Sequence, residues 1–345
     1  MNRLFFLIFF AISIGGYVTG CGNSSSLSSN TSANSIKSWD IVDLGLLPGS
    51  DYSAAYDVND SGAVVGESGV SITGLQYGFH WESGTLTSAP GYGKDVARSI
   101  NNDGVSVGIY LPLGGSFGFI SQKNGNVSFV QPPQGWYQTE LNCINNIGHT
   151  VGTGYRNALP SGNRGFLYDG ANLTPIEPLS GDLETWAIAL NDSDAVTGYS
   201  TANPNQAIGR GYIFKNGSVT EIGFLPGANN SYPEAINNQG VIVGISGGQA
   251  FRYSNGAMQA LGFLRGDTYS IAHGINENGE IVGRSGNRAF LFRAGTMIDL
   301  SALPVVQQAG WSTLYEARAV NSSGQIVGKG VRNGSYHAFL LSPIH

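Results

Sequence analysis

Short apolar segments alternate with glycine-containing turns along most of this chain, and the alternation repeats. An aliphatic residue followed by asparagine recurs at Val58-Asn59, Ile100-Asn101, Ile144-Asn145, Leu190-Asn191, Ile236-Asn237, Ile275-Asn276 and Val320-Asn321, in steps of 39 to 46 residues. Glycine stands three residues after each asparagine, except that Asp194 does so in the fourth copy. Asn-x-x-Gly is typical of a tight turn in which asparagine caps the start and glycine supplies a positive φ at the end.

The segments that flank these turns have the residue types of β-strands. The stretch after each turn is β-branched and ends in Gly66, Gly108, Gly152, Gly198, Gly244, Gly283 and Gly328. Glycine at the same point of every strand predicts a close approach of another backbone. A later strand carries an aromatic residue at Phe79, Phe119, Phe166, Tyr212, Phe251, Phe290 and Phe339. Two residues further on is another large apolar group (Trp81, Tyr168, Phe214, Tyr253, Phe292, Leu341), with Ser121 as the exception.

Four short strands in each of seven repeats predict an all-β fold, a seven-bladed β-propeller with four-stranded blades. A parallel β-helix would repeat faster, and a β-sandwich would show no such self-similarity. The last repeat stops after the segment 337–341 without a fourth strand, whereas an unassigned strand-like segment, 39–45, precedes the first repeat. We therefore expect the N-terminal strand to complete the last blade, which removes the exposed sheet edges.

The repeat resembles the HAF-type extracellular repeat, whose eponymous tripeptide is present at His337-Ala338-Phe339 and whose Leu-Pro-Gly element is present at Leu47-Pro48-Gly49. The likeness extends over residues 39–345. It implies an extracytoplasmic location, and it brings no activity or catalytic residues with it.

The N-terminal segment predicts how the protein reaches that location. A basic start is followed by an apolar run over residues 4–18, which is shorter than the ~20 residues that a bilayer-spanning helix needs. Val18-Thr19-Gly20-Cys21 resembles the bacterial lipobox, in which the cysteine is acylated and becomes the new N-terminus. The chain thus divides into a lipoprotein signal peptide (1–20), a lipidated Cys21 with a flexible Ser/Asn-rich tether (21–37) and the propeller (38–345). Because Gly22 rather than aspartate follows the cysteine, we expect the outer membrane or the cell surface.

Composition narrows the possible partners. The net charge is −6 without a Lys/Arg cluster, which argues against nucleic-acid binding.

With Cys21 acylated, Cys143 has no partner for an internal disulfide, and we interpret it as a buried structural thiol because it falls in a slot for small side chains. We expect a monomer without a cofactor.

No catalytic residue and no metal ligand can be assigned from the sequence. The histidines show no metal-binding spacing, and no nucleophile elbow is present. Asn59-Asp60-Ser61-Gly62 and the turn 276–279 resemble the start of a calcium loop but lack the later glutamate, so turn geometry is the preferred interpretation and a weak Ca²⁺ site the alternative.

Aromatic and variable positions indicate a recognition face on the side of the long connections. The aromatic residues proposed for binding are Trp136, Tyr137, Trp186, Trp311 and Tyr315. Three residues before each repeat asparagine the residue is Tyr56, Arg98, Asn142, Ile188, Glu234, His273 or Arg318. We expect a membrane-anchored module that binds a glycan or protein ligand there. The alternative is a hydrolase or lyase that acts on glycans or peptides through Arg98, Glu234, His273 and Arg318. A clustered carboxylate pair with a raised pKa at the channel mouth would favour the enzyme, and a broad aromatic face without such a pair would favour binding.

Overall fold

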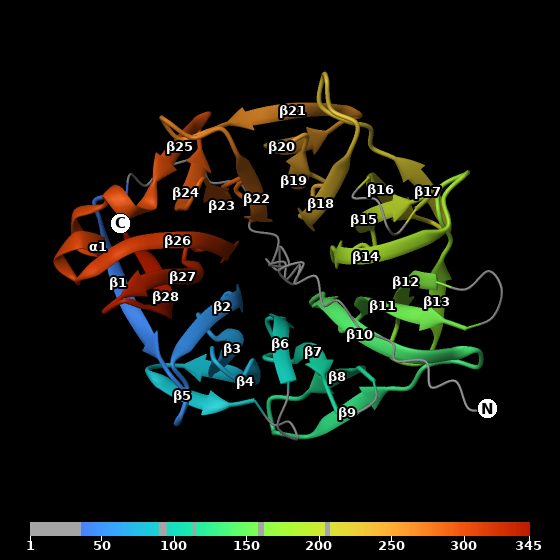
Figure 1. Cartoon of the computed structure of the whole chain (residues 1–345), viewed down its shortest axis with the longest axis horizontal. Helices are drawn as coiled ribbons and strands as arrows, with labels where there is room; N and C mark the ends of the chain where they lie inside the picture. The colour runs from blue at the N-terminus through green and yellow to red at the C-terminus, as the bar shows by residue number, and fades with distance from the viewer. Residues whose placement is uncertain (1–35, 90–94, 113–114, 158–161, 204–207) are drawn as a thin grey trace, which may run out of the picture.

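Seven four-stranded antiparallel sheets form a closed ring in the computed structural model, which describes residues 36–89, 95–112, 115–157, 162–203 and 208–345. Figure 1 shows the sheets radiating from a central axis like the blades of a propeller, with the first strand of each repeat nearest the axis. The predicted seven-bladed propeller is confirmed. No helix in the described ranges is both long and apolar enough to cross a membrane.

In each blade the strands run from the axis to the rim in the order of the sequence, except that β1 is the outermost strand of the last blade. They are β2 (Tyr52–Val58), β3 (Val64–Val70), β4 (Leu75–Glu82) and β5 (Thr85–Ser88); β6 (Asp95–Ile100), β7 (Ser106–Tyr110), β8 (Phe117–Ser121) and β9 (Val127–Val130); β10 (Trp136–Ile144), β11 (Thr150–Arg156), β12 (Gly162–Tyr168) and β13 (Leu173–Ile176); β14 (Glu184–Leu190), β15 (Val196–Thr201), β16 (Arg210–Lys215) and β17 (Ser218–Glu221); β18 (Ser231–Ile236), β19 (Ile242–Ser246), β20 (Gln249–Ser254) and β21 (Ala257–Gly262); β22 (Ser270–Ile275), β23 (Ile281–Ser285), β24 (Arg288–Arg293) and β25 (Thr296–Asp299); and β26 (Trp311–Val320), β27 (Ile326–Arg332), β28 (Ser335–Ile344) and β1 (Ser38–Gly45).

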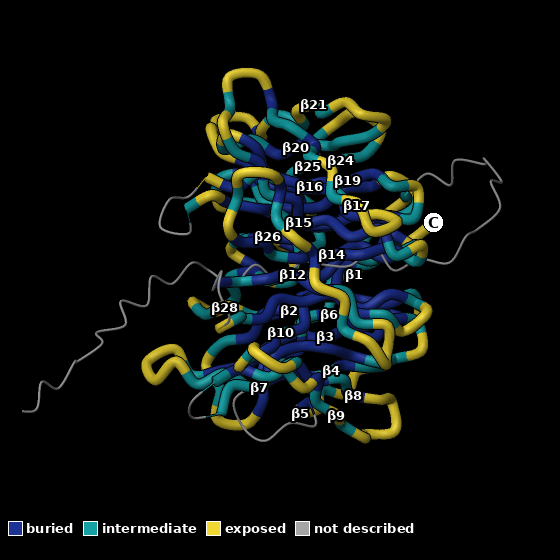
Figure 2. Tube along the Cα trace, turned by 90° about the vertical axis from the view of Figure 1, so that its right-hand side faces the viewer, coloured by how far each residue is buried: buried dark blue, intermediate teal, exposed yellow. Residues whose placement is uncertain are grey.

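The core lies between the blades. All seven repeat aromatics, from Phe79 to Phe339, are buried with at most 2% exposure. Figure 2 shows the buried strands across the middle of the disc and the exposed segments at its two faces. A 3₁₀ turn η1 (Leu300–Ala302) and a short helix α1 (Pro304–Gln308), which the repeat pattern does not predict, lie between β25 and β26, where α1 buries Val306.

The N-terminal strand closes the ring, as the sequence predicts. β1 pairs antiparallel with β28 from Ser38 opposite Ile344 to Gly45 opposite Ala338. The Asp43 carboxylate binds His337 Nδ1 at 3.0 Å and an Arg332 guanidinium nitrogen at 2.6 Å. Other blades pair the same strands in this way, for example Arg288 on β24 with Asp299 on β25 at 2.7 Å. β1 therefore supplies both the backbone and the acidic partner of a fourth strand.

The repeat asparagines join each blade to the next. Within its own turn, each Oδ1 accepts the backbone N–H four residues on at 2.8–3.0 Å, which is the predicted cap. Each side-chain Nδ2 also donates to the backbone carbonyl of the next repeat asparagine at 2.9–3.2 Å, and Asn321 donates back to Asn59. Seven hydrogen bonds thus form a closed circle around the axis, and all seven asparagines are buried.

Replacing one asparagine of this circle should lower stability measurably. In Asn145→Ala, the Asn191 carbonyl loses its side-chain donor and the backbone N–H of His149 loses its acceptor. Two buried hydrogen bonds of this kind predict a loss of about 2–4 kcal/mol in the free energy of unfolding. Denaturant titration against the exposed Asn229→Ala measures it. Equal midpoints for the two variants would show that the circle does not stabilise the ring.

Candidate site at the channel mouth

A β-bulge in each inner strand positions the variable residue of each repeat. At the same repeat position in every blade, the register of the inner strand with its neighbour skips a residue: Tyr56, Arg98, Asn142, Ile188, Glu234, His273 and Arg318; β10 and β26 have further skips nearer their start. A bulge removes its residue from the regular alternation and redirects its side chain. These are the positions that the sequence analysis singled out as variable.

The repeat glycine on the second strand makes room for the bulge. A Cβ atom built on any of these seven glycines would lie 1.9–2.1 Å from a carbonyl oxygen of the inner strand, two residues before the bulged one. The predicted close backbone approach is confirmed. The glycine therefore allows the chain to present a different side chain at the axis in each blade.

The bulged residues contact one another around the ring. An Arg98 guanidinium nitrogen donates to the Asn142 side-chain carbonyl, and the Asn142 amide donates to the Ala187 carbonyl at 2.8 Å. On the other side, His273 Nδ1 lies 3.4 Å from a carboxylate oxygen of Glu234. The Arg318 guanidinium lies 5.9 Å from the centre of the Tyr56 ring.

A second set of charged side chains joins this ring. Glu316 pairs with Arg318 at 2.9 Å and with Lys329 at 3.1 Å. Burial raises the pKa of Glu316, but these two cations outweigh it and hold the pKa well below the ordinary value. Burial raises the pKa of Glu67, and the hydrogen bond from Tyr56 and the nearby cations only partly offset it. The same cluster therefore holds two carboxyl groups with opposite pKa shifts.

Three buried polar atoms of the bulged residues have no hydrogen-bond partner within the described part of the chain. They are Arg98 Nε, Glu234 Oε1 and His273 Nε2. Burial and the charge of Arg318 lower the pKa of His273, so its imidazole is neutral near neutral pH. With Nδ1 directed to the Glu234 carboxylate, His273 Nε2 is then a hydrogen-bond acceptor.

Tyrosine rings and cations flank the cluster on the last two blades. Arg284 donates to the Tyr315 hydroxyl at 2.9 Å, and its guanidinium lies 5.2 Å from the Tyr315 ring centre and 5.4 Å from that of Tyr269. Lys329 lies 5.6 Å from the Tyr315 ring centre and 5.3 Å from that of Tyr336. The tyrosine rings can pack against a ring of a ligand, and the two cations can bind its polar groups.

The structure separates the predicted binding residues into two groups. Arg98, Glu234, His273, Arg318 and Tyr315 belong to, or flank, the charged cluster described above.

The tryptophans and Tyr137 make other contacts. Trp136 is half-buried against Phe166, Tyr137 is 46% exposed beside Tyr155, and Trp186 stacks on Tyr199 at 4.8 Å. Trp311 is 5% exposed and packs edge-on against Phe339, so it is a core residue unsuited to direct contact with a ligand.

Sequence reasoning missed four members of the site: Glu67, Arg284, Glu316 and Lys329. Three of them directly follow a repeat glycine, after Gly66, Gly283 and Gly328, where the other blades have Ile109, Thr153, Tyr199 and Ile245. Variation immediately after the repeat glycine is the signal that would have found these three, and no comparable signal marks Glu316.

The described residues contain no group of three or more His, Cys, Asp or Glu side chains that could hold a metal ion. In the turn that resembles a calcium loop, Asp60 instead accepts hydrogen bonds from Ser322 N at 3.0 Å and Asn102 Nδ2 at 2.9 Å. Its carboxylate thus links neighbouring turns.

Cys143 is fully buried in the small-residue slot of β10, as expected. Its sulfur belongs to a disulfide in the structure, so the expectation of a free structural thiol is wrong. The other cysteine of the chain, Cys21, lies outside the described residues.

Comparison with known proteins gives the fold alone. No protein-family model and no curated protein matches the chain. A solved structure of a catalytically inactive variant of virginiamycin B lyase from Staphylococcus aureus with quinupristin is 15% identical, with a TM-score of 0.55 over 89% of this chain and 100% of that one. A streptogramin B lyase is 12% identical (TM-score 0.56; 90% and 99% covered), and an oligogalacturonate lyase in complex with manganese is 11% identical (0.54; 89% and 97%). This chain is therefore similar to those proteins in its β-propeller fold.

Proposed function

We propose that the protein is a membrane-anchored, extracytoplasmic β-propeller that binds a glycan or protein ligand at its channel mouth. The observation that carries this proposal is the set of buried polar atoms on Arg98, Glu234 and His273 that lack partners among the described residues. Leaving such groups unsatisfied costs free energy, and a ligand that completes their hydrogen bonds would recover it. Donor and acceptor atoms together suit a polar ligand that carries both kinds of group.

Replacing Glu234 or His273 should weaken ligand binding about tenfold, since a buried polar group of the ligand that loses its hydrogen-bond partner costs roughly 1–3 kcal/mol. The experiment captures envelope components on the full-length protein in detergent, identifies the retained ligand and measures its affinity for Glu234→Gln and His273→Gln. Ile188→Val is the matched control at a bulge without polar atoms. Unchanged affinity in both polar variants would contradict a site at the channel mouth.

An enzyme at the same site is the second candidate, favoured by the opposite pKa shifts of Glu67 and Glu316. Glu67, whose pKa is raised, would hold the proton that a leaving group needs. Neutral His273, oriented by Glu234, would accept a proton through Nε2 from a carbon or from water. Such a pair would serve a lyase or a hydrolase.

Activity of that kind should show a bell-shaped dependence on pH. It is lost as pH falls through the lowered pKa of His273, because the base becomes protonated, and as pH rises through the raised pKa of Glu67, because the acid loses its proton. Glu67→Gln should abolish turnover of an identified ligand and leave binding within about threefold, as one retained neutral hydrogen bond allows. Turnover that persists in this variant would exclude Glu67 as the acid.

The membrane anchor rests on the lipobox-like segment Val18-Thr19-Gly20-Cys21. Several acyl chains, at ~0.8 kcal/mol for each buried CH₂, would hold the protein on a membrane essentially permanently. Because Gly22 follows the cysteine, the outer membrane or the cell surface is the proposed location. The HAF-like repeats are consistent with this location.

Cys21→Ser should release the protein from membranes or stall its processing. Fractionation and intact mass of the mature protein measure this, with Ser24→Ala as a control next to the site. Because the chain contains two cysteines, a thioether at Cys21 excludes a disulfide between them. A mature protein with unmodified or disulfide-linked Cys21 would therefore refute the anchor.

A further inference from the structure

One of the seven interfaces between blades differs from the others at its outer half. In six blades, the residue at the start of the second strand lies opposite a large apolar residue of the third strand. These pairs are Val64/Trp81, Thr150/Tyr168, Val196/Phe214, Ile242/Tyr253, Ile281/Phe292 and Ile326/Leu341. In the blade of β6–β9 the same pair is Ser106/Ser121. Two large side chains are thus replaced by two hydroxyl groups, both on buried residues.

The neighbouring blade has changed on the facing side. At five of the other six interfaces the third-strand residue just before the second large position is aliphatic and belongs to the same apolar cluster as the next blade, as Ile120 does with Tyr168 and Leu340 with Trp81; Arg252 is the exception. Across the third-strand positions these residues are Ile120, Leu167, Ile213, Arg252, Leu291 and Leu340. At the interface that faces Ser121 the residue is His80.

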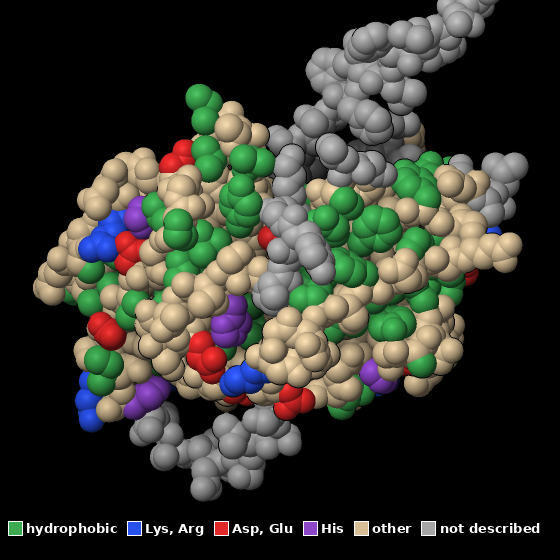
Figure 3. All heavy atoms as spheres, turned by 90° about the horizontal axis from the view of Figure 1, so that it is seen from below, with side chains coloured by type: hydrophobic (Ala, Val, Ile, Leu, Met, Phe, Trp, Pro, Cys, Tyr) green, Lys and Arg blue, Asp and Glu red, His purple; other side chains and the backbone are tan. Residues whose placement is uncertain are grey.

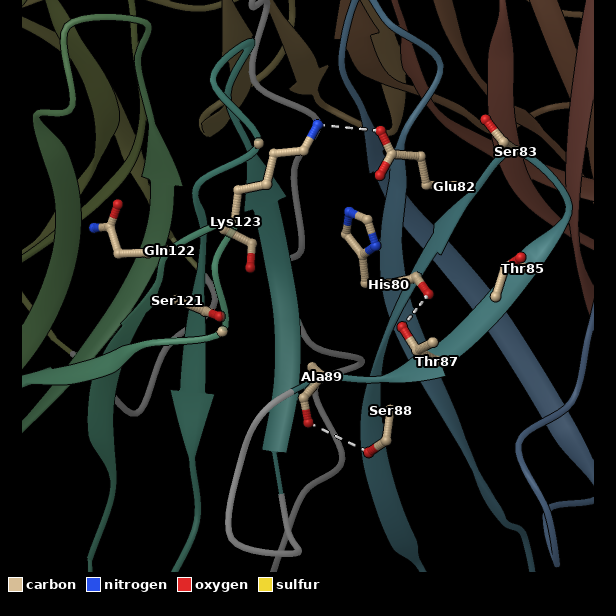
Figure 4. A pocket seen from close by; sticks show the side chains of 13 residues that line it. His80, Glu82, Ser83, Thr85, Thr87, Ser88, Ala89, Ser121, Gln122 and Lys123 are labelled. Carbon is tan, nitrogen blue, oxygen red and sulfur yellow. Dashed lines mark hydrogen bonds and ion pairs between the residues drawn. The ribbon is translucent and has the colours of Figure 1, made fainter.

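The result of these replacements is a groove of about 620 Å³ between β4–β5 and β7–β8. Seven of its thirteen lining residues carry a hydroxyl or amide side chain, among them Thr87, Ser88, Ser106 and Gln122, although more of the wall surface is apolar than polar. Figure 4 shows His80 in the gap between the two blades and the Lys123–Glu82 ion pair, 3.3 Å long, spanning the gap beside it. Figure 3 shows this flank of the molecule from below, where charged side chains occur singly or in small groups among uncharged surface.

The chemistry of the walls selects a ligand class. At this interface Ser106, Ser121 and His80 occupy positions that are mostly apolar at the other interfaces. The interface therefore lacks apolar packing contacts that the others make. Lys123, the only lysine among the described residues that line the groove, is paired with Glu82, so these lining residues offer no unpaired fixed charge for an ion. Burial lowers the pKa of His80, which leaves a neutral imidazole that can donate and accept hydrogen bonds. The volume lies in the range of small-molecule sites, roughly 300–1,000 Å³.

We propose that this groove binds a neutral, hydroxylated ligand, a mono- or disaccharide, through His80, Ser106, Ser121 and Gln122. It is a second site on the rim, separate from the channel mouth, and does not depend on what the channel binds.

The test is a titration of the full-length protein with glucose, galactose, N-acetylglucosamine, maltose and cellobiose, followed by the NMR signals of the His80 ring. We expect at least one sugar to bind saturably with Kd on the order of 1 mM or tighter. Ser121→Phe restores the residue type of the other blades and should fill the groove. It should weaken binding at least tenfold with an unchanged or raised unfolding midpoint, and Ser106→Val, which also follows the other repeats, should act in the same direction.

His273→Gln is the control, because it alters the channel mouth and should leave sugar binding at the groove unchanged. Binding that survives both Ser121→Phe and Ser106→Val, or that is lost in His273→Gln alone, would place the sugar elsewhere and overturn the proposal. The absence of saturable binding for every sugar in the set would also overturn it. Loss in His273→Gln alone would place the sugar at the channel mouth, whereas the absence of any sugar binding would leave the channel-mouth proposal untouched, because its readout is the ligand captured from the envelope.

Discussion

Deleting residues 38–45 should open the ring of blades and destabilise the propeller. The deletion removes the whole of β1, so β28 loses its ladder from Ser38/Ile344 to Gly45/Ala338 and becomes an open edge. Arg332 and His337 lose their common acidic partner, Asp43. Trp39 and Ile41 also leave the apolar cluster of the last blade. We expect the unfolding midpoint to fall by at least about 5 °C, which for a chain of this length is more than 2 kcal/mol.

The matched control is deletion of residues 22–35, which the sequence identifies as tether. Differential scanning fluorimetry of both truncations in the same detergent compares them directly. If the protein without β1 melts within about 2 °C of the intact protein, a change of less than ~1 kcal/mol, closure by strand exchange does not stabilise the ring.

Adding a single methyl group at a repeat glycine should be the most damaging point substitution. In Gly152→Ala the new Cβ would lie 1.9 Å from the Glu140 carbonyl oxygen and 2.8 Å from the Phe166 ring. The clash involves a backbone atom of the neighbouring strand, so the two strands must separate and cannot simply adjust a side chain. We expect a loss of at least about 3 kcal/mol in the free energy of unfolding, at the upper end for an overpacked core.

Gly115→Ala provides the comparison for this substitution. A Cβ at Gly115 meets nothing within 4 Å, and its φ lies outside the positive range that strains other residues. Urea titration should therefore show a shift within about 0.5 kcal/mol for Gly115→Ala, as for most surface substitutions. Equal stability of the two variants would mean that the strands at Gly152 are not held together as tightly as the structure shows.

The repeat made most of the fold predictable because the same turn residues and the same close-approach glycine recur in seven copies. Asn59 and Gly62 mark a turn through their own conformations, and Gly66 marks a close approach. The hydrogen bond made by the side-chain Nδ2 of each asparagine could not be predicted. The Asn59 Nδ2 donates to the carbonyl of Asn101, 42 residues away, and only the closed ring brings these two atoms together.

The candidate site was predictable only in part, for a similar reason. The variation of Glu234 and His273 was visible against a regular background, but the bulges that redirect them depend on backbone pairing. Glu316 and Lys329 come from different strands, and their meeting required the register of β26 with β27. Trp311 illustrates the opposite error, because a tryptophan after a long connection suggests a surface, whereas α1 and the last blade enclose it.

Ser121 shows how an exception within a repeat carries information. Its departure from the pattern was evident in the sequence, but its consequence depends on His80 in the preceding blade. Only the structure shows that the two replacements face each other across one interface.

The central claim is that the bulged residues of the inner strands form a binding site at the channel mouth. Its most direct test is a structure of the full-length protein with the molecule captured from the cell envelope. We predict that the molecule lies on the axis and hydrogen-bonds to Glu234 Oε1, His273 Nε2 and Arg98 Nε. A molecule bound elsewhere, with these three atoms still lacking partners, would contradict the claim.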